Sequence, residues 1–425
     1  MEQTPKANRI HIGFFGRCNA GKSTLINMLT DQPVSLVSEV AGTTTDPVSK
    51  SMEILPLGPV VITDTAGIDD TSELGALRIE KSEEIIKKIN LAVYVLRNDE
   101  APTADDMMWL NKLKQNNVPI ALFINEINAS DSESTHDKDS NGNDANLNYV
   151  DAYPDLSAIA TVVGSTDFTS NRDRLTLLDL LGGLTPLDVE GEQSLLQGLV
   201  DPGDTIILVC PIDSAAPKGR LILPQVQTIR EILDHKGLAL VCQTEELPTM
   251  LNKLSQKPKL VITDSQAFEA VNALTPADIP LTSFSILMAR FKGKLQDLVT
   301  GVKALNNLKP GARVLISEGC THRRQCDDIG TVKIPMWLKK KGYTDLQLEF
   351  TSGGAFPKDV SGYDLIIHCG ACMLTRREVL RRIDCAVVQG TPIVNYGVLI
   401  ASLHGILERA ISPFMDELDR KGFEC

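Results

Sequence analysis

The chain has 425 residues, of which 43% are hydrophobic and 23% charged, as in an ordinary globular protein with two to four domains. A net charge of −13 excludes a basic surface of the kind that binds a phosphate backbone, so we expect no nucleic-acid partner. A membrane-spanning helix needs about 18 consecutive apolar residues, and the sequence contains no apolar run of that length. We also find no targeting segment. We therefore expect a cytoplasmic protein without a membrane contact.

The first part of the chain alternates strand-like and helix-like segments. Strands are expected at 10–15, 60–64, 91–96, 119–124 and 158–163. Helices are expected at 21–30, 74–88, 103–116 and 172–182. This alternation predicts an α/β fold with a parallel sheet and helices on both faces. Residues 129–155 interrupt it with a polar, acidic stretch that we interpret as a disordered insertion.

Two further α/β blocks follow a linker at 182–193. Their strands are expected near 204–209, 238–242, 259–264, 312–317, 345–350, 363–368 and 392–395. Helices of the last block are expected near 333–341, 375–384 and 398–411. The pattern predicts three domains with limits at 1–184, 194–278 and 279–425.

A phosphate-binding motif follows the first strand. The stretch "GRCNAGKST" fits G-x-x-x-x-G-K-[ST], and it stands between a strand and a helix as that loop requires. Backbone N–H groups and the helix N-terminus would cradle the phosphates of GTP, with Lys22 on the β- and γ-phosphates and Ser23 on Mg²⁺. The expected nucleotide-binding residues of this loop are Gly16, Asn19, Ala20, Gly21, Lys22, Ser23 and Thr24.

Two further segments have the spacing of a nucleotide switch. The strand "VVITDTAGI" ends in D-x-x-G, where Asp64 would hold Mg²⁺ through water and the Gly67 N–H would sense the γ-phosphate. In "AGTTTD", Thr44 is the candidate that closes on Mg²⁺, with Thr43 or Thr45 as alternatives. Together these segments resemble the translation-factor-type GTPases, especially the Era and TrmE-like branch.

That resemblance has consequences for catalysis. Position 68 is Ile, where Ras-like proteins place a water-orienting Gln. In the branch that the chain resembles, a K⁺ ion held partly by the phosphate-loop Asn replaces an arginine finger, and Asn19 occupies that place. We therefore expect slow, K⁺-stimulated GTP hydrolysis, with a purely structural role of Asn19 in the loop as the alternative.

The segment that should recognise the base departs from N-K-x-D. Asn125 and Asn128 stand at its ends, but Glu126 replaces the Lys and Asn128 replaces the Asp. Loss of the carboxylate that accepts from guanine would weaken binding by roughly 1.5–3 kcal/mol. Relaxed guanine specificity, with xanthine as a plausible base, is the resulting hypothesis.

Near the C-terminus, "CTH" and "HCGAC" each follow a strand-like run. They contain Cys320, His322, His368, Cys369 and Cys372, in the pattern C-x-H…H-C-x-x-C. Ligands bind at the carboxyl ends of strands in open α/β sheets, so two neighbouring strands could bring these groups together. Such a set suits an iron–sulfur cluster, structural zinc or, less well, a thiol redox site.

A GTPase domain followed by this Cys/His pattern resembles the HydF family of FeFe-hydrogenase maturation GTPases. The resemblance implies a GTPase domain, a dimerisation domain and a 4Fe–4S cluster-binding domain. It also implies Cys320, Cys369 and Cys372 as cluster thiolates, His368 as a labile fourth ligand and His322 as a further site residue. The expected activity is that of a homodimeric scaffold that accepts and delivers the di-iron subcluster. Its partners would be the hydrogenase apoprotein and the radical-SAM maturases.

The alternative function is a zinc-stabilised Era-like GTPase switch in RNA or ribosome assembly. Of the other cysteines, Cys210 and Cys242 are expected in the hydrophobic core. The basic stretch "TRREVLRR" (375–382) after the second motif is either a solvated helix face or a charge complement to an anionic cluster.

Overall fold

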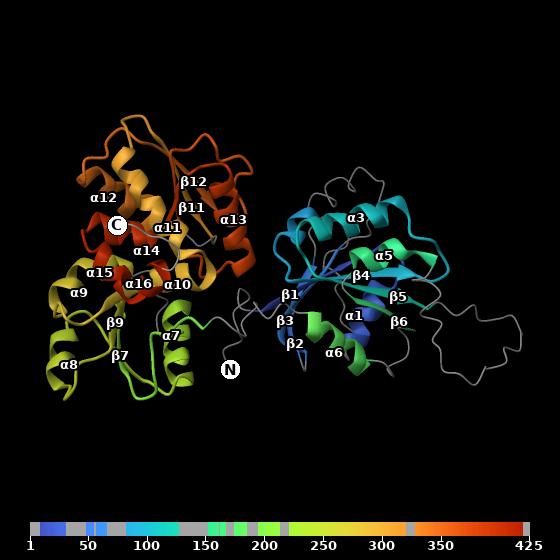
Figure 1. Cartoon of the computed structure of the whole chain (residues 1–425), viewed down its shortest axis with the longest axis horizontal. Coiled ribbons are helices and arrows are strands. Elements are labelled where there is room, and N and C mark those ends of the chain that lie inside the picture. Colours follow the sequence, from blue (N-terminus) through green and yellow to red (C-terminus); the bar gives the residue numbers. More distant parts are fainter. Residues whose placement is uncertain are drawn as a thin grey trace, which may run out of the picture. The chain divides into compact units, whose positions relative to one another are not determined.

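The computed structural model describes residues 9–30, 48–54, 57–65, 82–126, 152–160, 162–166, 174–184, 194–212, 221–319 and 328–419. The chain divides into two compact units, Met1–Glu190 and Gly191–Cys425, which are drawn in Figure 1 and treated separately below. Among the described residues, no helix is long and apolar enough to cross a membrane.

The first unit is built on one sheet of the order β2-β3-β1-β4-β5-β6, counting the strands that the structure describes. The strands are β1 (Ile10–Phe15), β2 (Val48–Ile54), β3 (Gly58–Asp64), β4 (Leu91–Arg97), β5 (Ile120–Asn125) and β6 (Val162–Thr166). The helices are α1 (Lys22–Thr30), α3 (Ala104–Gln115), α5 (Pro154–Ile159) and α6 (Arg174–Leu184).

Alternating side chains of the central strands fill a core on each face of this sheet. On β4, Val93 and Val95 pack with residues of α1 and α6, whereas Tyr94 and Leu96 pack with residues of α3. Figure 1 shows α1 and α6 on one side of the strands and α3 and α5 on the other. Burial on both faces explains the continuous apolar strands and confirms the predicted layers.

Three expectations for the first unit were incomplete or wrong. Strand β2 was missed, and it pairs with β3 in antiparallel fashion, whereas the other pairs are parallel. The strand expected at 158–163 begins at Val162, after α5, so the insertion expected at 129–155 overlaps an ordered helix. Of the helix expected at 74–88, residues 82–86 are helical and 74–81 lie outside the described residues.

The second unit contains two four-stranded sheets among its described residues, with the orders β10-β9-β7-β8 and β12-β11-β13-β14. The strands are β7 (Thr205–Val209), β8 (Leu238–Cys242), β9 (Leu260–Thr263), β10 (Leu281–Ser283), β11 (Arg313–Glu318), β12 (Gln347–Ser352), β13 (Leu365–His368) and β14 (Ile393–Asn395). All pairings in both sheets are parallel.

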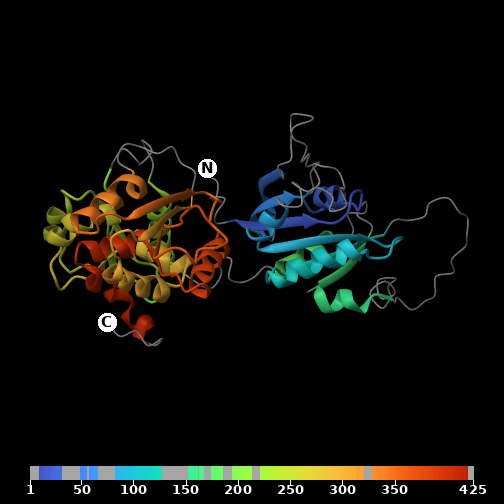
Figure 2. The same ribbon diagram turned by 90° about the horizontal axis from the view of Figure 1, so that it is seen from above.

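Helices connect these strands. The α-helices are α7 (Leu223–Asp234), α8 (Leu247–Lys253), α9 (Phe268–Leu274), α10 (Phe284–Lys292), α11 (Leu295–Gly301), α12 (Ile334–Lys340), α13 (Arg376–Val388), α14 (Tyr396–Leu403), α15 (Leu407–Ile411) and α16 (Met415–Asp419). Short 3₁₀ or π turns are η4 (Ser265–Ala267), η5 (Val302–Asn307), η6 (Ile329–Lys333) and η7 (Ser412–Phe414). The yellow second sheet and the orange and red third sheet lie side by side in Figures 1 and 2 and share one hydrophobic core.

The predicted strands of this unit agree with the structure to within about two residues, but one helix does not. The helix expected at 398–411 is split into α14 and α15 by Gly405, whose φ of +73° is left-handed. The domain limits stay predictions. Strand β10, just beyond the expected limit at residue 278, pairs with β9 in the second sheet.

In the third sheet, β11 and β13 are neighbours, and the chain leaves them in opposite directions, toward β12 and toward β14. This reversal is a topological switch point, where open α/β sheets bind their ligands beyond the carboxyl ends of the strands. "CTH" follows β11 and "HCGAC" begins at the end of β13.

Candidate functional site

The phosphate loop requires its glycines for steric reasons. Gly16 has φ +137°, and a Cβ there would lie 2.5 Å from the carbonyl oxygen of Val95 on β4. Gly21 also has a positive φ, of +102°. Asn19 has φ +59°, a left-handed conformation that Asn tolerates better than most residues. The backbone conformation is therefore one reason why Asn suits position 19.

Lys22 lies inside this loop. Its ammonium donates to the carbonyl oxygens of Gly16 (2.8 Å) and Arg17 (2.7 Å), so the loop is closed over it. The neighbouring Asp64 ends β3; burial raises the pKa of its carboxyl group, against the opposing charge of Lys22. Oδ1 of Asp64 is buried without a hydrogen-bond partner among the described residues. An orphaned buried carboxylate oxygen beside a phosphate loop fits a water-mediated Mg²⁺ ligand.

The base-recognition segment contacts the phosphate loop through Asn125. Nδ2 of Asn125, at the end of β5, donates to the carbonyl oxygen of Ala20 over 3.2 Å. Of the other expected nucleotide residues, Ser23 and Thr24 lie exposed in the first turn of α1. Thr44, Gly67 and Asn128 lie outside the described residues.

In the second unit, the structure brings the end of β11 against the second cysteine motif. Ser317 is the register partner of His368, so the chain leaves both strands at the same level. The N–H of Gly319 donates to Sγ of Cys369 over 3.0 Å, and the N–H of Ala371 donates to the same sulfur over 3.3 Å. A left-handed φ of +55° at Ala371 turns that amide back toward the sulfur.

The structure describes three of the five expected ligand residues. His368, Cys369 and Cys372 lie together at the switch point, whereas Cys320 and His322 lie outside the described residues. No group of three or more His, Cys, Asp or Glu side chains that could hold a metal occurs among the described residues. Gly319, directly before Cys320, nevertheless lies within hydrogen-bond distance of the Cys369 sulfur.

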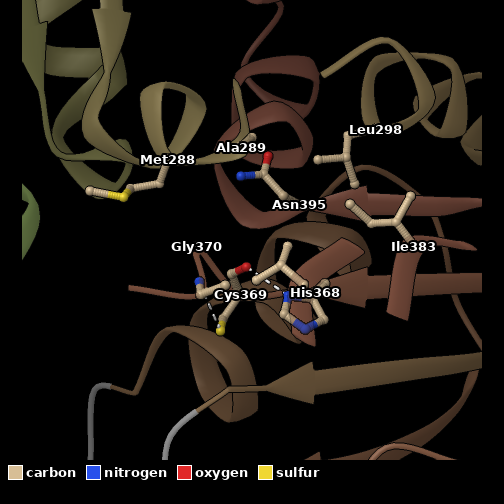
Figure 3. Close-up of a pocket in the computed structure, with 10 residues that line it drawn as sticks. Met288, Ala289, Leu298, His368, Cys369, Gly370, Ile383 and Asn395 are labelled. Carbon is tan, nitrogen blue, oxygen red and sulfur yellow. Dashed lines mark hydrogen bonds between the residues drawn. The ribbon is translucent and has the colours of Figure 1, made fainter. Parts of the chain in front are cut away.

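His368 is buried and held at both ring nitrogens. Its Nδ1 lies 2.9 Å from the carbonyl oxygen of Cys369 (Figure 3), and its Nε2 lies 3.2 Å from Nη1 of Arg382. A guanidinium can only donate, so Nε2 accepts and Nδ1 carries the proton. Burial, together with the Arg382 charge, lowers the pKa of His368 to about 4, which keeps the ring neutral at pH 7.

The surroundings of the two cysteines are apolar but carry buried cations. Burial raises the pKa of Cys369 to about 11 and also raises that of Cys372. Arg382 is 1% exposed and pairs with Glu378 (Nε to Oε1, 2.7 Å), and Lys292 is 2% exposed. Metal binding by such thiols must release their protons, and nearby cations favour the thiolate.

Sequence analysis missed Lys292 and misjudged part of the basic stretch 375–382. Arg382 is fully buried, so a solvated helix face is the wrong description of that residue. The spacing Glu378–Arg382 could have suggested an i, i+4 pair, but nothing in the sequence indicates that the pair is buried. Lys292 is the last residue of α10, and a lysine at the end of a helix is usually exposed.

Comparisons with protein families decide the affiliation of the chain. Residues 195–293 match the Hydrogen maturase F dimerization domain, and residues 296–413 match the Hydrogen maturase F tetramerization domain. The two matches cover about half of the chain. The chain belongs to the HydF family. Residues 11–126 match the family described as 50S ribosome-binding GTPase, so this HydF chain carries a GTPase domain, as predicted.

Individual relatives are similar to part of this chain. The tRNA modification GTPase MnmE of Endomicrobium trichonymphae is 32% identical over 121 residues, which are 28% of this chain and 26% of that protein. GTPase Der of Campylobacter curvus is 33% identical over 118 residues, 28% of this chain and 25% of that protein. The chain thus spans about a quarter of these relatives. The Aquifex aeolicus Era structure aligns with 58% of this chain and 98% of its own, at 19% identity and a TM-score of 0.34.

Proposed function

We propose that this HydF-family protein is a GTP-hydrolysing scaffold for FeFe-hydrogenase maturation. Its C-terminal site would hold a 4Fe–4S cluster that accepts the di-iron subcluster and delivers it. The observation that carries the proposal is the pair of backbone N–H groups, from Gly319 and Ala371, aimed at the Cys369 sulfur at the switch point of the third sheet. Hydrogen bonds of this kind stabilise a thiolate and tune the potential of the cluster that it binds.

The residues present fit such a cluster. Cys369 and Cys372 would supply two thiolates and Cys320 the third, with His322 close to the site. When bound, the cluster would supply an iron site to which the di-iron unit attaches. Buried Lys292 and Arg382 offer positive charge around the anionic group, and Arg376 contacts the same region through the carbonyl oxygen of Phe291 (3.3 Å).

His368 as the fourth ligand stays a prediction, and the geometry defines what it requires. Because Nε2 accepts from Arg382 and Nδ1 donates to the Cys369 carbonyl, iron binding needs one of these hydrogen bonds to open. A ligand that must first leave a protein partner is readily exchanged. This is the behaviour expected of a position that gives way to an incoming di-iron unit.

In the GTPase domain, Lys22 would hold the β- and γ-phosphates of GTP, and Ser23, Thr44 and Asp64 would hold Mg²⁺. Asn19 would contribute to a K⁺ site that stimulates slow hydrolysis. Gly67 would respond to the γ-phosphate. These roles follow from the motif match and from the orphaned, buried Oδ1 of Asp64.

Base specificity follows from the Asn125–Asn128 segment. Asn125 supports the phosphate loop through its hydrogen bond to Ala20, and Asn128 would replace the usual carboxylate acceptor. We expect weakened or relaxed guanine specificity. Competition binding with GTP, XTP and ATP measures it, and a sub-micromolar GTP affinity with strong rejection of the other two contradicts it.

The proposed partners are a second copy of this chain, the FeFe-hydrogenase apoprotein and the radical-SAM maturases, all in the cytoplasm. The matches to dimerization and tetramerization domains support self-assembly. GTP hydrolysis transfers no electrons, so nucleotide state would gate partner binding or delivery. Locked GTP and GDP states that bind partners and deliver equally well contradict this gating role.

Anaerobic reconstitution with iron and sulfide tests the central proposal. The reduced protein should give a 4Fe–4S EPR signal that is lost or altered in Cys320→Ser and Cys369→Ser. Cys385→Ser is the matched control, because Cys385 on α13 is no expected ligand. A single tightly bound zinc without a cluster overturns the proposal and favours the zinc-stabilised GTPase switch.

A further inference from the structure

Lys292 joins the two HydF-specific segments of the second unit. It is the last residue of α10, within the segment that matches the dimerization domain, and its side chain is 2% exposed. Its ammonium donates to the carbonyl oxygens of Cys372 (3.0 Å) and Leu374 (2.8 Å). Both carbonyls belong to residues 369–374, here called the cysteine loop, in the segment that matches the tetramerization domain.

These two hydrogen bonds constrain the shape of the loop. A buried ammonium is stable only when its donors are satisfied, so the lysine and the carbonyls hold each other in place. Met373 lies between Cys372 and Leu374, whose carbonyl oxygens accept from Lys292, and its own side chain is exposed. One side of the loop is therefore held by Lys292, while the other side faces solvent. The Leu374 N–H donates back to Ala371 (3.1 Å), which closes the turn that contains Cys372.

Lys292 also acts on charge. Its ammonium lies 3.0 Å from the carbonyl oxygen of Cys372, so a positive charge is held beside the residue that would bind the cluster. The same cation would stabilise negative charge on a cluster bound through Cys372. Since a reduced cluster carries one more electron than an oxidised one, a nearby fixed cation favours the reduced form.

Other residues of α10 also lie next to the cysteine loop or to the neighbouring strand β14. Met288 and Ala289 line the small apolar cavity beside Cys369 (Figure 3). Ser285 Oγ accepts from the Gly397 N–H (3.1 Å), and its carbonyl oxygen accepts from Asn395 (2.8 Å), at the end of β14. The helix is therefore anchored along its length, and a lysine at its end is held in a defined position.

We propose that Lys292 is a positioning residue that fixes the cysteine loop from helix α10 and supplies a buried positive charge to the cluster. The cluster part rests on the proposed function. The loop part does not, because both hydrogen bonds join groups of the protein itself. The dimerization segment would thereby set the geometry and potential of the site in the neighbouring segment.

The test compares Lys292→Met with Lys294→Met in the full-length protein. Lys294 is two residues away and pairs with Asp384 on α13, but it is half exposed, and no hydrogen bond joins it to a loop carbonyl among the described residues. Both variants lose one positive charge. Hydrogen–deuterium exchange of residues 369–374 without a cluster reports loop fixation, and a redox titration followed by EPR reports charge.

Lys292→Met is expected to exchange at least tenfold faster in the loop than the wild type or Lys294→Met. Its reconstituted cluster should be harder to reduce by about tenfold in the one-electron equilibrium, which is a negative shift of about 59 mV. Unchanged loop exchange overturns the positioning role. Equal potentials in the two variants overturn the charge role.

Two further variants keep the test decisive. Lys292→Arg preserves the charge and should restore most of the potential. Lys292→Gln keeps a hydrogen-bond donor but has no charge. Its loop amides should exchange more slowly than those of Lys292→Met, while its cluster should keep the lowered reduction potential. This variant replaces Lys292→Met if the Met variant does not fold. If the wild type binds no cluster at all, the proposed function fails, while the exchange experiment still decides whether Lys292 fixes the loop.

Discussion

Nη1 of Arg382 lies 3.2 Å from Nε2 of His368, and the same guanidinium pairs with Glu378 and donates to the carbonyl oxygen of Gly353 (2.6 Å). One buried arginine therefore fixes the tautomer of the histidine next to Cys369. It also links α13 to β13 and to the segment after β12. The arrangement makes the histidine a hydrogen-bonded part of the protein framework.

The Glu378 carboxylate is expected to stabilise the second unit strongly. It is buried and accepts from Arg381 (2.7 and 2.8 Å) and Arg382 (2.7 Å), so Glu378→Gln leaves two guanidiniums without a counter-charge. We expect a loss of about 3–5 kcal/mol at pH 7 in urea unfolding. Glu349→Gln makes the same chemical change in the exposed pair with Arg313 and should cost far less. Equal losses in both variants would refute the role of burial.

The same pair gives a pH dependence. Burial acts to raise the pKa of Glu378, but its hydrogen bonds and the charges of Arg381 and Arg382 outweigh it, and the net pKa is lowered. Its contribution is therefore complete above the unfolded-chain pKa of about 4.3 and is lost as pH falls through the folded-state value. The stability difference between wild type and Glu378→Gln should narrow as pH falls below about 4.3. A constant difference down to pH 3 would contradict this assignment.

The Asp64 carboxylate is expected to lower the stability of the nucleotide-free protein while supporting Mg²⁺ and nucleotide binding. Burial raises its pKa, and its Oδ1 lacks a hydrogen-bond partner among the described residues. Asp64→Asn should therefore stabilise the nucleotide-free protein by about 1–3 kcal/mol while removing the further stabilisation by Mg²⁺ and GDP. Thermal unfolding with and without Mg·GDP measures both effects. A less stable nucleotide-free variant would show that the carboxylate has a structural partner.

Asn19 allows backbone and side-chain roles to be separated. Asn19→Gly keeps the left-handed φ of +59° without strain and removes the amide, so nucleotide binding should persist while K⁺ stimulation of hydrolysis is lost. Asn19→Ala adds a backbone cost of about 1–2 kcal/mol and should weaken binding as well. Turnover in KCl against NaCl is the measurement. A Gly variant that K⁺ still stimulates would assign position 19 to loop geometry alone.

Cys210 and Cys242 are expected to resist alkylation in the folded protein. Burial raises their pKa values to about 12 and about 11, so few of these thiols ionise at pH 8. Cys18 is exposed in the phosphate loop and provides the internal control. Iodoacetamide labelling followed by mass spectrometry should modify Cys18 first. Rapid labelling of Cys210 would indicate that the second sheet opens.

Local patterns explain how much of this protein could be predicted. The phosphate loop is encoded in nine consecutive residues, and its glycines report backbone angles that only they adopt easily. The middle of β11 (314–316) and the first three residues of β13 (365–367) are short apolar runs, since both faces of a parallel sheet are buried. Strand β2 was missed because VSKSMEI is polar on its exposed side and lies at the edge of its sheet.

Motifs whose residues are neighbours in the chain can be found without a structure: the phosphate loop, the apolar strands and the C-x-x-C spacing. Which distant groups complete the cysteine site depends on how the chain folds. Gly319 reaches Cys369 across 50 positions and Lys292 reaches Cys372 across 80. Lysine and arginine are read from sequence as surface residues, because their burial depends on carbonyls and carboxylates that folding alone brings within reach.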